Sequence, residues 1–101
     1  MEQQFRVDDL RALMIYLSPT QKITDPATVE AMQHARMLIE AAVKDRENSD
    51  KVVLDMLPVD FQVVSSLFFV AMEAANRLGM IGISFGWLQL AKTQKFIAQQ
   101  I

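Results

Sequence analysis

The sequence contains no cysteine, and this absence excludes disulfide bonds and thiolate metal sites. His34 is its only histidine, so a metal site would need carboxylates alone, and we predict that no metal is bound. A glycine-rich phosphate loop is also missing, because the three glycines come late and are scattered: Gly79, Gly82 and Gly86. No Ser-His-Asp arrangement stands out. We therefore expect a protein that is not an enzyme and that uses no cofactor.

The charge and hydropathy of the chain narrow the class further. Its 101 residues are 51% hydrophobic and 22% charged, which is enough for one compact domain over residues 1–101. The net charge is −2 and no basic stripe is present, which disfavours binding to nucleic acid or to an anionic membrane, so we expect no nucleic-acid partner. The start of the chain is polar and acidic, unlike a signal peptide, and no apolar run approaches the roughly 20 residues of a membrane helix. We predict a cytoplasmic protein with no membrane insertion.

The segment from Lys51 to Leu67 is the one around which the predicted fold is organised. Val52–Leu54 is a β-branched apolar run and predicts a strand buried on both faces. Asp55 ends the run, and Pro58 takes the chain out of the sheet because it cannot donate to a ladder. In parallel sheets, partners and ligands meet the protein beyond the carboxyl ends of the strands. The loop after this strand is therefore the predicted functional region.

The remaining elements follow from hydrophobic periodicity and from stop signals. Asp25 is a helix N-cap and Pro26 suits the first helical position. Ser65 or Ser66 is predicted to cap the second helix, and Gly79 to end it. The expected elements are strands at Gln3–Val7, Leu10–Leu17, Val52–Leu54 and Ile81–Phe85, and helices at Asp25–Arg46, Ser65–Leu78 and Leu88–Gln99. This β-β-α-β-α-β-α order predicts an α/β domain with a mixed sheet and helices packed on it. The first two strands would form a hairpin.

Ser65 and Ser66 admit two readings. One is helix capping alone. The other is a phosphoacceptor, because a phosphate would add roughly −1.5 to −2 charges at a helix N-terminus, where free N–H groups favour an anion. Such a group would repel an acidic partner or disrupt an apolar interface. The sequence leaves both readings open.

The side chains around these serines are unusually apolar. Val63 and Val64 precede them, and Phe69 and Met72 lie on the helix side that carries Glu73. One reading is a wide buried face or a contact with the last helix. The other is an exposed apolar patch for a protein partner.

The central segment resembles the STAS domains, the bacterial anti-sigma-factor antagonists and their relatives. Their pattern V-L-D-L-x-x-V-x-F-x-D-S-S-G-L falls in the same register, without a gap, as Val53–Met56, Val59–Phe61 and Ser65–Leu67. The family's helix start D-x-x-T-x-x-x-L is similar to Asp25, Thr28 and Met32. The resemblance implies a non-catalytic regulatory protein that binds a partner such as an anti-sigma-type serine kinase or phosphatase. Phosphorylation at the start of the second helix would release that partner.

The family's phosphoacceptor falls on Ser65, and its acidic residue, first serine and glycine fall on Val63, Val64 and Ser66. A divergent member is therefore expected. The predicted interface is Asp60, Val63, Val64, Ser65, Ser66, Phe69, Met72 and Glu73, supported by Asp25 and Asp55.

Two alternatives remain beside this hypothesis. In a receiver-like domain, Asp8 and Asp9 would hold magnesium and Asp55 would accept a phosphate. In a self-associating assembly subunit, the apolar patch would bind a second copy and give a homodimer.

Overall fold

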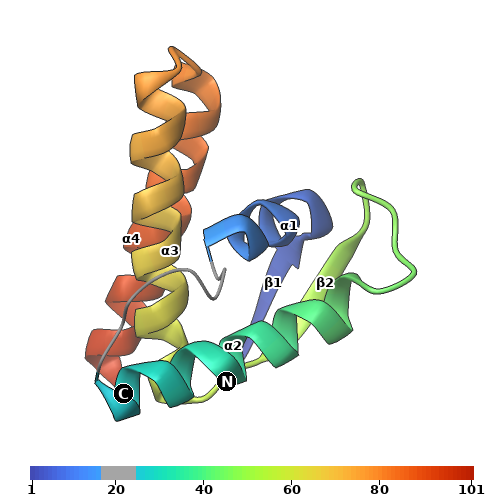
Figure 1. Ribbon diagram of the computed structural model, residues 1–101. Helices are drawn as coiled ribbons and strands as arrows, with labels where there is room; N and C mark the ends of the chain where they lie inside the picture. The colour runs from blue at the N-terminus through green and yellow to red at the C-terminus, as the bar shows by residue number, and fades with distance from the viewer. Residues whose placement is uncertain (17–24) are drawn as a thin grey trace.

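A computed structural model describes residues 1–16 and 25–101. The elements are β1 (Glu2–Arg6), α1 (Val7–Tyr16), α2 (Pro26–Val43), β2 (Lys51–Asp55), α3 (Pro58–Arg77) and α4 (Ile81–Gln100). They form a small mixed α/β structure, with four helices and a two-stranded sheet among the described residues. Figure 1 shows α3 and α4 as a long hairpin beside the sheet, with α2 running from the base of that hairpin towards β2.

The sheet pairs β1 with β2 in antiparallel register, with Phe5 opposite Val52. The strands expected at Gln3–Val7 and Val52–Leu54 are confirmed as β1 and β2, except that Val7 begins α1. The expectation that Val52–Leu54 is buried on both faces is wrong, because Val52 and Leu54 are buried whereas Val53 is 57% exposed. A sheet of two strands has one face on the core and the other towards solvent.

The expected strand at Leu10–Leu17 is wrong over its described part, because the chain is helical there in α1. Val7, Leu10 and Leu13 are fully buried at a spacing of three, which is the periodicity of a helix. Asp8 and Asp9 lie in the first turn of α1, where the helix dipole stabilises negatively charged side chains. The expected hairpin is also wrong, since β1 pairs with β2 across the two intervening helices.

The helix start at Asp25 is confirmed. The Asp25 carboxylate accepts hydrogen bonds from Thr28 N at 3.1 Å and from Thr28 Oγ1 at 2.5 Å, and Pro26 is the first helical residue. The helix ends at Val43 rather than at Arg46.

The third helix starts well before the predicted position. Pro58 is its first residue, and the Asp60 carboxylate accepts from Leu57 N at 2.8 Å, so the expected loop and the expected serine cap are both wrong. Proline suits the first helical position because its missing N–H would have no partner there. Gly79, at φ 74°, follows the end of the helix as predicted.

The expected strand at Ile81–Phe85 is wrong, because these residues form the first turns of α4. The helix expected at Leu88–Gln99 is confirmed within α4. A short apolar run of this kind fits a strand and a buried helix equally by pattern, and packing on α3 decides the outcome. Ser84 Oγ, for example, donates to the main-chain oxygen of Met72 at 3.2 Å. The β-α-α-β-α-α order replaces the expected one.

The core lies where the sheet, α1 and α3 meet. The rings of Phe5 and Phe68 stack with centroids 6.1 Å apart. Trp87 Nε1 donates to Asp9 Oδ1 at 3.0 Å and joins α4 to α1. Among the described residues, α3 alone is long and apolar enough to cross a membrane, a test that a core helix also passes.

Candidate functional site

A buried carboxylate lies at the start of α3. The Asp60 side chain is fully buried, and its Oδ1 is 2.9 Å from His34 Nδ1 on α2. Its Oδ2 accepts the hydrogen bond from Leu57 N. A carboxylate removed from water needs bonds to both oxygens, and here each oxygen has one. The N-terminal end of the α3 dipole also favours the negative charge.

This arrangement fixes two helices relative to each other. His34 is 40% exposed, so its ring lies between Asp60 and solvent. The bond to Asp60 orients the imidazole, and the same carboxylate holds the first turn of α3. The pair thus sets the position of α3 on α2.

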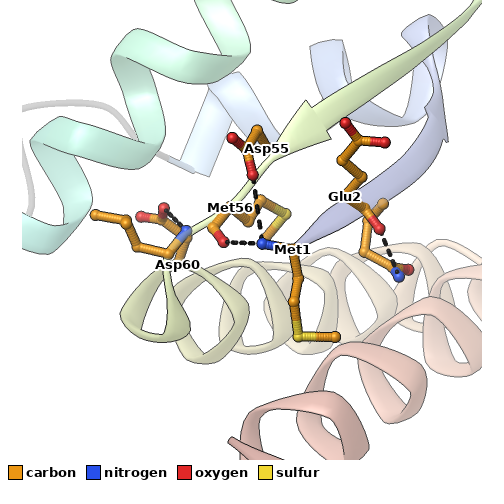
Figure 2. Close-up of polar contacts among 7 residues, drawn as sticks. Met1, Glu2, Asp55, Met56 and Asp60 are labelled. Atoms are coloured by element: carbon orange, nitrogen blue, oxygen red, sulfur yellow. Dashed lines mark hydrogen bonds and ion pairs between the residues drawn. The ribbon is translucent and has the colours of Figure 1, made fainter.

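The end of β2 adds a second set of contacts near the same turn. Figure 2 shows the amino group of Met1 between Asp55 and Met56, with Asp60 nearby at the start of α3. The nitrogen is 3.3 Å from Asp55 Oδ1 and 3.1 Å from the Met56 oxygen. The Asp55 side chain is exposed, so this ion pair is weak.

A hollow of about 490 Å³ lies between the N-terminal halves of α2 and α3, and we name it the α2–α3 groove. Most of its lining is apolar and comes from both helices: Ala31 and Met32 of α2, and Val59, Val63, Leu67 and Val70 of α3. Thr28, Gln62 and Ser66 add polar groups. Val59 and Val70 are each 43% exposed, so the groove presents apolar surface to solvent.

A second hollow of about 370 Å³ lies between α3 and α4, and we name it the α3–α4 hollow. Its lining includes Phe69 of α3 and Lys95 of α4. Gln62 and Ser66 line this hollow as well as the α2–α3 groove. These two residues therefore form a polar ridge between an apolar groove and a hollow that contains a cation.

The predicted interface residues are divided between core and surface. Asp60, Val64 and Ser65 are buried, and Ser65 Oγ donates to the main-chain oxygen of Ala91 at 2.8 Å. Ser65 thus has its hydroxyl committed to the contact between α3 and α4. The other predicted interface residues reach the surface: Val63, Phe69 and Met72 are half-buried, and Ser66 and Glu73 are exposed.

The acidic residues of the receiver-like alternative are not brought together. Asp8 and Asp9 follow Arg6, which pairs with Lys51, whereas Asp55 pairs with Glu2 at the other end of the sheet. No group of three metal-ligating side chains occurs among the described residues. Burial raises the pKa of Asp9 above its ordinary value, and the hydrogen bond from Trp87 opposes that rise.

The supporting residue Asp25 acts locally as a cap. Its hydrogen bonds from the Thr28 side chain and main chain lower the pKa of the Asp25 carboxyl. The cap orders the first turn of α2, and Thr28 itself lines the α2–α3 groove.

Sequence reasoning missed three features of this region: the His34 contact, the polar ridge residue Gln62, and Lys95. A signal for the first was present, because Pro58 followed two residues later by Asp60 is typical of a helix start. That start places Asp60 on the face that packs on α2.

Scans against protein-family models, curated proteins and solved structures each return no match for this chain.

Proposed function

We propose that this chain is a small cytoplasmic regulatory protein that binds a partner protein in the α2–α3 groove and catalyses no reaction itself. The groove is the observation that carries the proposal. Its walls are mostly apolar, and Val59 and Val70 expose apolar surface within it. Exposed apolar surface in a hollow is typical of sites that bind other proteins.

The shape of the groove favours one kind of partner segment. Two helices form its walls, and a groove between helices suits the apolar face of an amphipathic helix. The pair of His34 and Asp60 holds these walls in place, so little ordering is needed on binding.

Ser66 is the residue that we assign to control of binding. Its side chain is exposed and lines the groove, whereas Ser65 is buried under α4. A phosphate on Ser66 would bring roughly −1.5 to −2 charges to the edge of an apolar site. Lys95 lines the hollow on the other side of Ser66 and offers a cation to such a group.

The resemblance of residues 51–67 to STAS domains supports regulation by reversible protein binding. On that resemblance the partner is an anti-sigma-type serine kinase or phosphatase. We carry over this regulatory role and not the family's order of strands and helices. The serine that matches the family's glycine, Ser66, takes the role that the family gives to the residue at Ser65.

The experiment is a comparison of captured proteins. Tagged wild-type protein and the variants Val70→Glu and Met37→Glu are used to capture partners from native lysate, and the proteins are quantified by mass spectrometry. Met37 is 69% exposed on α2 and does not line the groove, so it is the matched control. We expect at least one protein retained by wild type and Met37→Glu and lost with Val70→Glu. Equal capture by all three would refute the proposal, and a dimer in sedimentation that Val70→Glu dissociates would support self-association instead.

A further inference from the structure

The strand β2 has one edge that pairs with no other strand among the described residues, where the sheet consists of β1 and β2 alone. Met1 and Met56 exchange two main-chain hydrogen bonds, of 3.1 and 2.8 Å, and so face each other across the ladder. Successive residues of a strand direct their N–H and C=O groups alternately to one side and to the other. Lys51, Val53 and Asp55 therefore direct theirs away from β1, and these groups bond to no other described residue. An edge of this kind can accept a further strand.

The charges on the solvent-facing side of the sheet repel each other across the two strands. Glu2 lies opposite Asp55 at one end of the sheet, and Arg6 lies opposite Lys51 at the other. Figure 2 shows Glu2 and Asp55 on their neighbouring strands. Like charges directly opposite each other destabilise a sheet. Lys51 forms no ion pair within the described part of the chain, so a carboxylate from outside would complement it.

We propose that β2 pairs antiparallel with β2 of a second copy of the chain, about a two-fold axis at Val53. In this register Lys51 of each copy lies opposite Asp55 of the other. The two Val53 side chains, each 57% exposed in the single chain, lie opposite each other. The pairs use the main-chain groups that are left unpaired, and each pair exchanges two hydrogen bonds. The product is one sheet with the strand order β1-β2-β2-β1.

Charge complementarity selects this register and a second copy as the partner. The five residues of β2 have a cation at one end and an anion at the other, so an antiparallel pair of them joins opposite charges twice. A shift by two residues would place Lys51 opposite Val53 and lose both charge pairs. The Met1 amino group contacts Oδ1 of Asp55 at 3.3 Å, and this side chain is 84% exposed, so its Oδ2 is left for Lys51 of the other copy.

The free edge of β1 fits a second copy less well. Its central residue is Gln4, which has a lower preference for strands than the β-branched Val53. Arg6 at its end already pairs with Asp8 at 3.1 Å. The edge of β2 is therefore the one that we assign to dimerisation.

The test reverses one charge at a time and then mixes the two variants. Lys51→Glu places carboxylates opposite each other in the dimer, and Asp55→Lys places ammonium groups opposite each other. Each variant alone should dimerise at least ~10-fold more weakly than wild type in analytical ultracentrifugation. An equimolar mixture should dimerise as wild type does, because every charge pair between the copies then joins opposite charges. Within one chain the new charges face Arg6 and Glu2 favourably, so both variants should keep the fold in circular dichroism.

Proline variants identify the edge. Val53→Pro removes an N–H that β1 does not use, so it should abolish the dimer and keep the fold. Gln4→Pro makes the same change on the edge of β1 and should leave the dimer intact, as should Val70→Glu in the α2–α3 groove.

The interface is small, so wild type is measured at high micromolar concentration. A monomeric wild type, a mixture of the two charge variants that stays monomeric, or a dimer that survives Val53→Pro would overturn the proposal. So would a dimer that Gln4→Pro or Val70→Glu dissociates. Loss of partner capture with Val70→Glu leaves this dimer unchanged, which separates the proposal from the protein-binding one.

Discussion

His34 Nδ1 lies 2.9 Å from Oδ1 of the fully buried Asp60. The contact joins the middle of α2 to the first turn of α3, the two helices that form the α2–α3 groove. Because Oδ2 of the same carboxylate holds Leu57 N, one side chain both starts α3 and positions it on α2. The geometry of the groove therefore depends on this pair.

Replacing Asp60 should destabilise the fold strongly. Asp60→Ala removes the partner of His34 and leaves Leu57 N without its acceptor, so we expect the free energy of unfolding to fall by about 3 kcal/mol. Urea denaturation followed by circular dichroism measures this. Asp60→Asn keeps an oxygen for Leu57 N and should lose less. A loss below about 1 kcal/mol in both variants would show that the buried pair does not hold the helices together.

The two serines should respond differently to a negative charge. Ser65→Glu buries a carboxylate against α4, so we expect it to unfold the hairpin, whereas Ser66→Glu should fold normally because Ser66 is exposed. Ser65→Ala should lower stability by about 1 kcal/mol through the lost bond to Ala91. The melting temperatures of wild type, Ser65→Glu, Ser66→Glu and Ser65→Ala are compared by thermal unfolding. A stable, folded Ser65→Glu would contradict the packing of α3 on α4.

Asp9 should make stability depend on pH. Burial raises the pKa of this carboxyl above 3.8, so the folded state holds the proton more tightly than the unfolded state. The resulting stability is present below about pH 3.8 and is lost as the pH rises through the folded-state pKa. Asp9→Asn can still accept from Trp87 and has no such loss. We expect its stability relative to wild type to be greater at pH 7 than at pH 3. An equal difference at both pH values would contradict the shift.

Two glycines at the α3–α4 turn provide a matched pair. Gly79 has φ 74°, so Gly79→Ala should lower the free energy of unfolding by about 1 kcal/mol. Gly82 is helical with space for a Cβ, so Gly82→Ala should raise it by a similar amount, about 1 kcal/mol. Urea unfolding curves measure both changes, because a shift of the midpoint reports a change in stability when the slope of the unfolding free energy against urea concentration stays the same. If Gly82→Ala were as destabilising as Gly79→Ala, residues 81–85 would not be helical in solution.

Local chemistry in the sequence accounts for much of the fold. Asp25 with Pro26 predicted the start of α2, and Gly79 predicted the end of α3, because caps and left-handed glycines act within a few residues. The β-branched run at Val52–Leu54 predicted β2. These signals do not depend on distant parts of the chain.

The errors arose where tertiary packing decides the outcome. Leu10–Leu17 and Ile81–Phe85 are short apolar runs, and each became helical because it packs along one side: α1 through Leu10 and Leu13, α4 through Ser84 and Ala91. The candidate site was affected in turn. Taking Pro58 as a loop residue placed Ser65 at a helix start, whereas an N1 proline places it in the interior of the hairpin.

Photo-crosslinking from within the groove tests the central claim most directly. A benzophenone amino acid is placed at position 70 in the groove or at position 37 outside it, and the protein is irradiated in native lysate. We expect a crosslinked partner from position 70, none from position 37, and a reduced yield from position 70 when Ser66→Glu is added. The same crosslinks from both positions, or none from position 70, would contradict binding in the α2–α3 groove.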